Sequence, residues 1–131
     1  GNVWVSMAYS GDVVSLQSDN PDLRFAYPEE GNVIFTDELM MPAGVQHPYA
    51  AETMMNYLYE PEVAATLAAY INYISPVKGA QEALMKRDPK IAENELIFPP
   101  AEVQERFQSY PSLEPADERE MQEAMAQVTG A

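Results

Sequence analysis

Apolar and polar positions follow two different periods along the chain, and the period changes near residue 46. Before that point, short apolar runs alternate with clusters of turn-forming residues, which is typical of β-strands. One short helix is expected between the first two runs, over about residues 13–19. The runs that predict strands are residues 3–9, 23–27 and 33–35. This part of the sequence therefore predicts a small α/β unit.

After residue 46 the apolar residues recur at the three- and four-residue spacing of amphipathic helices. Pro48 and Pro61 each stand where a helix can begin, because the first helical turn leaves its N–H groups unpaired. Consecutive prolines at positions 99 and 100 predict an extended connector over residues 96–100. Further helices are predicted over about residues 80–87, 101–108 and 116–128. The fold class expected is α/β and rich in helix.

Two adjacent acids interrupt an otherwise apolar stretch at residues 31–42. Asp37 and Glu38 follow a good strand former, Phe35, and a charge in such a place indicates a strand end or a site. Neighbouring residues of an extended backbone point to opposite faces, so Phe35 shares a face with Asp37 and not with Glu38.

Composition narrows the class of partner. The chain has 131 residues, enough for one domain, and its 21 acidic and 7 basic side chains give a formal charge of -14. Such a surface repels phosphate, so no nucleic-acid partner is expected, whereas a cationic ligand or plain solubility would both suit it. Cys is absent, so neither a disulfide nor thiol chemistry is available. No apolar run reaches the roughly 18 residues of a membrane span.

The residues give little support to catalysis. One His and no Cys argue against a zinc site, and the six glycines form no phosphate loop, so no metal or cofactor is expected. Ser10, His47 and Asp37 formally supply a triad, but a triad depends on geometry and not on inventory. An acid–base pair of Asp37 and Glu30 remains as an alternative hydrolase hypothesis. We expect no catalytic residues and no enzyme.

Aromatic rings near a carboxylate suggest a different chemistry. Tyr9 ends the first predicted strand, Phe35 and Asp37 share one face of the third, and Tyr73 follows the second long helix. Ring faces attract a cation, and a carboxylate accepts a charge-assisted hydrogen bond from an amine. Spacing alone favours core roles for these rings, so an organic-cation site is the second interpretation.

The sequence resembles the periplasmic polyamine (spermidine/putrescine) substrate-binding proteins of ABC transporters. Single motifs are weak, but their ordered series along nearly the whole chain is specific. The segments that carry the resemblance are Ala8-Tyr9-Ser10-Gly11-Asp12, Asn20-Pro21 with Leu23, Tyr27-Pro28-Glu29-Glu30-Gly31, Phe35-Thr36-Asp37, Met41-Pro42, Ala50-Ala51, Asn56-Tyr57-Leu58, Glu60-Pro61-Glu62-Val63-Ala64, Tyr70 to Pro76, and Ile97-Phe98-Pro99.

The resemblance implies a two-lobed type II periplasmic binding protein, of which residues 1–131 would form the C-terminal portion as a single incomplete unit. Residues 1–36 would belong to the second lobe as a strand-helix-strand segment. Residues 37–85 would cross the hinge into the first lobe, and residues 86–131 would return to the second. The chain starts at Gly1 without a Met, which suggests a processed, cut or engineered end. Self-association, a swapped copy or pairing with the missing half is then expected.

The resemblance also assigns ligand-binding residues. Asp37 stands where the family's carboxylate holds a ligand amine, Phe35 and Tyr9 stand where the family often has Trp, and Tyr73 matches a Tyr of the wall. Gln108 matches, more loosely, a polar residue for the far amine. The implied partners are a polyamine and an ABC permease of the inner membrane, and the implied location is the periplasm or a membrane-anchored extracellular position.

Two alternatives stay open beside this reading. The chain could be a structural or interaction fragment that binds nothing small. It could also bind another small organic cation, because Phe and Tyr in place of Trp keep a ring face but offer less area.

Overall fold

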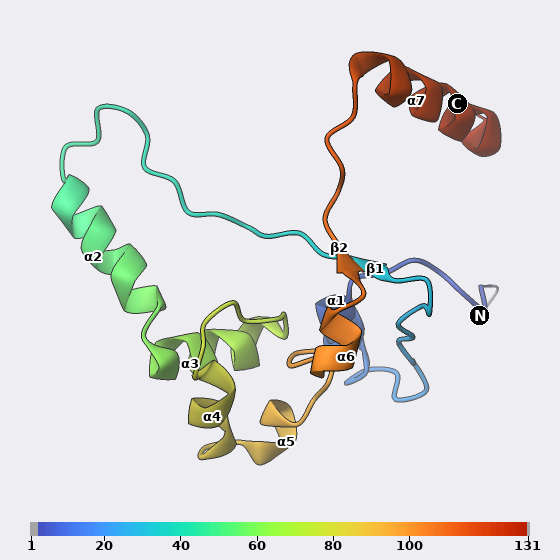
Figure 1. Cartoon of the computed structure of the whole chain (residues 1–131). Helices are drawn as coiled ribbons and strands as arrows, with labels where there is room; N and C mark the ends of the chain where they lie inside the picture. Colours follow the sequence, from blue (N-terminus) through green and yellow to red (C-terminus); the bar gives the residue numbers. More distant parts are fainter. Residues whose placement is uncertain (1–2, 131) are drawn as a thin grey trace.

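The structure is a computed structural model that describes residues 3–130 (Figure 1). Gly1, Asn2 and Ala131, at the two ends of the expected unit, lie outside the described residues. In chain order the elements are α1 (Ser10–Leu16), β1 (Asn32–Val33), α2 (Pro48–Leu58), α3 (Pro61–Ile71), α4 (Ala80–Met85), α5 (Pro89–Ala92), α6 (Ala101–Gln104), β2 (Phe107–Gln108) and α7 (Pro115–Thr129). The chain is therefore rich in helix, as expected, and its strands are very short.

Helices α3, α4 and α5 form the best-packed part of the molecule. Small side chains let them approach closely, and Ala65, Leu84 and Ala92 lie at the centre with at most 2% of their surface exposed. The helices predicted to begin at Pro48 and Pro61 are confirmed, as is the helix predicted over residues 80–87, which ends at Met85.

Asp88 begins α5, because its carboxylate accepts a hydrogen bond from the Ile91 N–H at 3.2 Å. One prediction for the next segment is wrong. The connector expected over residues 96–100 is extended only at its end. A turn on Asn94 precedes it, and this turn buries Ile97 at 1% exposure and packs Phe98 against the core.

A two-stranded parallel sheet joins the early and late parts of the chain. Asn32 pairs with Phe107 and Val33 pairs with Gln108. A turn leads into β1: the Gly31 N–H donates to the main-chain oxygen of Pro28, and Gly31 has φ 118°, which favours glycine. The helix predicted over residues 101–108 ends at Gln104, because pairing with β1 draws its last residues into β2.

The other strand predictions are wrong. Residues 3–9 and 23–27 have no regular structure, and only the start of the third run is a strand. A strand needs a neighbour for its N–H and C=O groups, and the described residues supply none for these segments. Helix α1 begins three residues earlier than expected, and neither Ser10 nor Asp12 caps it through its side chain.

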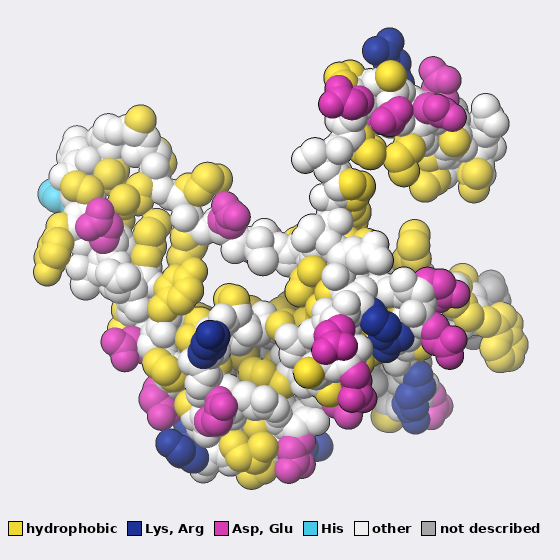
Figure 2. Space-filling model, in the orientation of Figure 1, with side chains coloured by type: hydrophobic (Ala, Val, Ile, Leu, Met, Phe, Trp, Pro, Cys, Tyr) yellow, Lys and Arg dark blue, Asp and Glu magenta, His cyan; other side chains and the backbone are white. Residues whose placement is uncertain are grey.

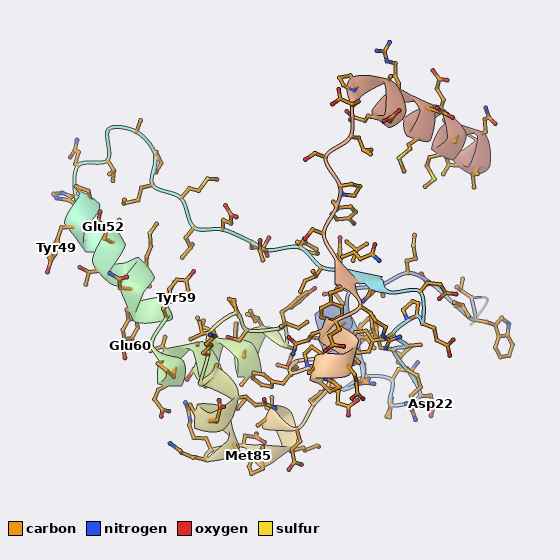
Figure 3. The ribbon with its side chains drawn as sticks, in the orientation of Figure 1. Asp22, Tyr49, Glu52, Tyr59, Glu60 and Met85 are labelled. Carbon is orange, nitrogen blue, oxygen red and sulfur yellow. The ribbon has the colours of Figure 1, made fainter. Side chains whose placement is uncertain are left out.

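Two helices stand away from the packed part (Figure 1). Helix α2 follows residues 34–47, which are irregular and contain a turn at residues 43–44, and α7 follows the extended residues 109–114. Neither helix has a buried residue. Tyr49, Glu52 and Tyr59 point outward from α2 and from the residue that follows it (Figure 3). The helix predicted over residues 116–128 is confirmed, but acids line one side of α7 and uncovered apolar side chains line the other (Figure 2).

Among residues 3–130, no helix combines the length and the apolar character that crossing a membrane requires.

Candidate functional site

Two of the predicted ligand-binding rings are in contact. Tyr9 is the residue before α1, Phe35 follows β1, and their ring centroids are 5.5 Å apart at an interplanar angle of 65°. This edge-to-face arrangement is a favourable one for aromatic pairs. About half of each side chain is exposed, 55% for Tyr9 and 46% for Phe35, so the pair can still contact a ligand.

Tyr73 reaches α1 from the end of α3. Its hydroxyl donates a hydrogen bond of 2.8 Å to Oδ1 of Asp12, and its ring lies against the backbone at Gly11. Partial burial, this hydrogen bond and the nearby acidic groups raise the pKa of Tyr73 to about 12. Tyr73 is therefore a neutral hydrogen-bond donor at neutral pH.

Asp37 acts on the same hydroxyl. The negative charge of Asp37 contributes to the raised pKa of Tyr73, as do the neighbouring Asp12 and Tyr9. Asp37 itself is exposed. Tyr9, Phe35, Tyr73 and Asp37 thus gather at one place, which we call the aromatic face. It offers ring surfaces and carboxylates, which is a combination that attracts an ammonium group.

Gln108 occupies a different setting. Its main chain in β2 accepts a hydrogen bond of 2.9 Å from the Ile34 N–H, whereas its side-chain amide lies near Gly31. With Glu30, Asn32 and others it lines a small hollow of about 140 Å³ beside β1. None of the four residues of the aromatic face lines that hollow.

The catalytic triad that the sequence could formally supply is not assembled within residues 3–130. His47 stands at the start of α2, well away from Ser10 in α1, so the Ser10–His47–Asp37 triad is not assembled (Figure 1). Glu30 lines the hollow beside β1 and not the aromatic face. Among residues 3–130, no three His, Cys, Asp or Glu side chains are grouped to hold a metal ion.

Two residues of the site region escaped prediction. Asp12 and Gly11 were named only within a segment that resembles the family, yet both contact Tyr73, 61 and 62 residues further along the chain. Ser10-Gly11-Asp12 gives no local signal of a partner so distant. A glycine inside a helix, where another residue would stabilise more, was the one available hint.

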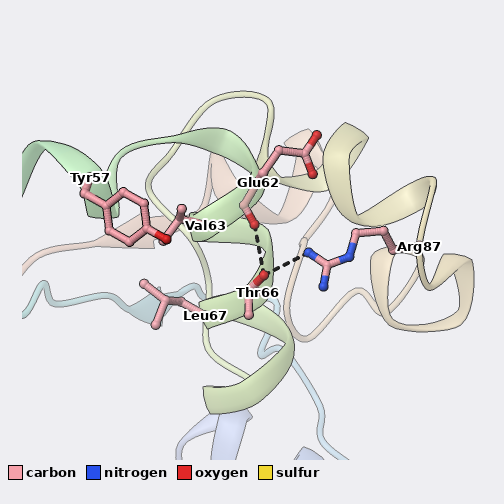
Figure 4. Close-up of a pocket in the computed structure, with 6 residues that line it drawn as sticks. All are labelled: Tyr57, Glu62, Val63, Thr66, Leu67 and Arg87. Carbon is pink, nitrogen blue, oxygen red and sulfur yellow. Dashed lines mark hydrogen bonds between the residues drawn. The ribbon is translucent and has the colours of Figure 1, made fainter.

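A larger hollow lies between the end of α2 and α3, away from the aromatic face (Figure 4). Its volume is about 320 Å³. Arg87 donates a hydrogen bond of 2.8 Å to Oγ1 of Thr66. The Thr66 hydroxyl in turn donates to the main-chain carbonyl oxygen of Glu62 at 3.0 Å. The full lining is Tyr57, Glu62, Val63, Thr66, Leu67 and Arg87.

Comparison with known proteins gives one family. The sequence profile of the family described as "Bacterial extracellular solute-binding protein" matches residues 1–98. No solved structure matches the chain.

Three curated relatives illustrate the similarity. The spermidine/putrescine-binding periplasmic protein of Salmonella typhimurium (strain LT2) is 28% identical over 102 residues, which cover 78% of this chain and 28% of the relative. The putrescine-binding periplasmic protein PotF of Escherichia coli (strain K12) is 26% identical over 134 residues, covering 98% of this chain and 35% of the relative. The putrescine/agmatine-binding protein of Pseudomonas aeruginosa (strain PAO1) is 26% identical over 104 residues, covering 75% of this chain and 28% of the relative.

The aligned part of this chain spans about a third or less of the length of these relatives.

Proposed function

Because the chain belongs to the family of bacterial extracellular solute-binding proteins, we propose that it supplies part of a polyamine site in an ABC uptake system. The observation that carries this proposal is the aromatic face, where Tyr9, Phe35 and Tyr73 gather with Asp37. The family binds solutes and is not a family of enzymes, and the relatives' names include spermidine, putrescine and agmatine.

The chemistry of the face suits a linear diamine. Rings at Tyr9 and Phe35 would lie along the methylene chain, while Asp37 would accept a hydrogen bond from one ammonium group. The acidic balance of the chain would attract such cations from a distance. The role of Gln108 toward a second amine belongs to this proposal as well.

We propose further that the chain binds another polypeptide segment, which covers its exposed apolar side chains. Residues 3–9 hold several almost fully exposed apolar side chains, among them Trp4 and Met7 at 97% each. Surfaces of this kind mark an interaction site. The complement would be the part of the solute-binding fold to which this chain does not align, or a second copy that supplies equivalent strands. Two lobes closing on a ligand in the periplasm would then meet an inner-membrane permease.

The direct test is isothermal titration calorimetry of the chain with putrescine and with spermidine, each at low and high salt. We expect weak binding, because the aromatic face is open and, in this proposal, another polypeptide segment supplies the rest of the site. Heat that disappears completely at high salt would indicate only diffuse attraction to the acidic surface. That result would contradict a polyamine site on this chain.

A matched pair of variants separates binding at Asp37 from nonspecific attraction to the acidic surface. Asp37→Ala and Glu38→Ala each remove one negative charge from adjacent exposed positions. A lost charged hydrogen bond costs about 1.5–3 kcal/mol, so Asp37→Ala should weaken binding by about tenfold or more. Glu38→Ala should change it little. Equal losses in both variants would contradict the role of Asp37.

A second candidate function has its own observation. The exposed apolar side chains of residues 3–9 and of α7 favour an interaction segment that binds no small molecule. Light scattering after size exclusion measures the mass in solution. A stable assembly that shows no heat with either polyamine would favour this alternative over the polyamine site.

A further inference from the structure

The segment that follows α3 is held against α1 by its first two residues, Asn72 and Tyr73. Asn72 ends α3 in the left-handed region at φ 61°, and its side-chain amide donates to Oγ of Ser15 at 3.2 Å. Ser15 donates in turn to the Gly11 oxygen at 3.1 Å. The next residue, Tyr73, reaches the first turn of α1. Segments more than fifty residues apart are thus joined at one place, which we call the α1–α3 joint.

Gly11 leaves room for the Tyr73 ring. It is one of the two buried residues of α1, and a Cβ built there would stand 2.8 Å from Cγ of Tyr73 and closer still to two further ring atoms. Such distances are shorter than van der Waals contact allows. Glycine is a poor residue inside a helix, so α1 gives up stability at this position. The ring explains why the position has no side chain.

Asp12 orients the same ring from its other end. Its Oδ1 accepts the hydrogen bond from the Tyr73 hydroxyl at 2.8 Å, which fixes both the reach and the rotation of the side chain. The ring is therefore held at two points, along its edge by Gly11 and at its tip by Asp12.

We propose that Gly11 and Asp12 are positioning residues that hold the Tyr73 ring in the aromatic face. Gly11 acts by the absence of a side chain, and Asp12 acts as a hydrogen-bond acceptor. Adding a side chain at Gly11, or removing the hydrogen-bond acceptor at Asp12, moves the ring away from Tyr9 and Asp37. The inference rests on the proposed function only where a polyamine is concerned, because the placement of Tyr73 is measurable without a ligand.

The first test is a thermal double-mutant cycle followed by circular dichroism. Without the ring contact, Gly11→Ala should stabilise the helix and raise the Tm. In the wild-type background we expect Gly11→Ala to lower the Tm, and in a Tyr73→Ala background we expect it to raise the Tm. The same direction of change in both backgrounds would overturn the role of Gly11.

The second test reads the hydroxyl of Tyr73 directly, by its ultraviolet tyrosinate titration as a difference from Tyr73→Phe. The groups that act on this hydroxyl are Asp12, Tyr9 and Asp37. Asp12→Asn keeps an acceptor but removes the charge, so the pKa of Tyr73 should fall from about 12 toward its ordinary 10. Asp22→Asn, on an exposed turn away from the joint, should leave the titration unchanged (Figure 3). An unchanged titration in Asp12→Asn would contradict the contact.

The third test separates positioning from ligand contact, by titrating putrescine into two Asp12 variants. If Asp12 positions Tyr73, Asp12→Asn should bind close to wild type and Asp12→Ala should bind severalfold more weakly. Equal losses in both variants would mean that the charge itself contacts the ligand, and would overturn the proposal. If the wild type binds no putrescine, the polyamine function fails, while the Tm cycle and the tyrosinate titration still decide the placement of Tyr73.

Discussion

The packed helices α3 to α5 and the isolated helix α7 show opposite fates for similar sequence patterns. Both contain apolar residues at helical spacing, yet α3 buries Ala64, Ala65 and Ala68, whereas α7 leaves Met121 and Met125 more than half exposed. The difference lies in what stands nearby. Short turns bring α4 and α5 back onto α3, while an extended connector carries α7 away from every partner in the described chain.

The comparison teaches that an apolar stripe predicts that a helix forms. The stripe does not predict which element, if any, packs against that helix. Where a short turn brings a neighbouring helix back, the apolar stripe is buried within this chain. Where the stripe stays exposed, as in α7, no part of the described chain covers it. The same reasoning applies to residues 3–9, which have the apolar content of a strand and no neighbour to pair with.

The largest expected effect is in the packed unit. Leu84 is 2% exposed at the centre of the α3–α5 core, so Leu84→Ala should lower the free energy of unfolding by about 2–5 kcal/mol. Met121→Ala in α7, where the side chain is 61% exposed, should change it by less than about 0.5 kcal/mol. Urea unfolding of both variants measures the contrast. Similar losses would mean that α7 is buried in solution.

The next effect concerns the β1–β2 pair, which joins residues 32–33 to residues 107–108. Gly31 combines φ 118° with a position where a Cβ would stand 2.7 Å from the Arg106 oxygen. Gly31→Ala should therefore cost about 1–3 kcal/mol and weaken the β1–β2 pairing. Gly44 has φ 82° in open space, so Gly44→Ala carries the backbone strain without the clash.

Hydrogen exchange of the Asn32 and Ile34 amides, which donate across the β1–β2 pair, reads the pairing directly. Both should exchange faster in Gly31→Ala than in Gly44→Ala. Equal exchange in the two variants would contradict the contact at Arg106.

A smaller effect separates a capped helix from an uncapped one. The Asp88 carboxylate accepts the Ile91 N–H at the start of α5, so Asp88→Ala should cost about 1 kcal/mol. Glu114 stands at the equivalent position of α7 without a side-chain cap. Glu114→Ala should leave the free energy of unfolding nearly unchanged in the same denaturation experiment, and equal losses would remove this distinction.

The smallest effect is a dependence on alkaline pH. Tyr73 has a pKa of about 12 in the folded chain, against an ordinary value of about 10. Its contribution to stability is therefore fully present below pH 10 and is lost as the pH rises through 12. Because the side chain is only partly buried, the loss should be smaller than that of Asp88→Ala. Tyr73→Phe should flatten this part of the stability profile, and an unchanged profile would contradict it.

Most helices could be predicted because their signals are local. Pro48 and Pro61 mark helix starts by backbone chemistry alone, and both starts are observed. Strands could not be predicted in the same way, because a strand exists only with a partner. The run at residues 3–9 finds none, whereas Phe107 and Gln108 leave a predicted helix to pair with β1.

For the candidate site, spacing alone favoured core roles for the rings, and only the family resemblance placed them together as ligand-binding residues. Tyr9 and Phe35 were expected to share a site and are in contact. Asp12 and Gly11 were missed because their partner, Tyr73, lies about sixty residues further along the chain. Ligand roles for Asp37, Phe35, Tyr9, Tyr73 and Gln108 stay predictions until binding is measured, as do the lobe boundaries near residues 36 and 85.

The central claim is that the aromatic face takes a polyamine, and nuclear magnetic resonance of the aromatic rings tests it most directly. On addition of putrescine, the ring signals of Tyr9, Phe35 and Tyr73 should shift together with one saturation curve. Tyr49 and Tyr59 are exposed outward-pointing controls that should not move (Figure 3). Shifts confined to the three rings would support the claim. Equal shifts at all five rings, or none, would contradict it.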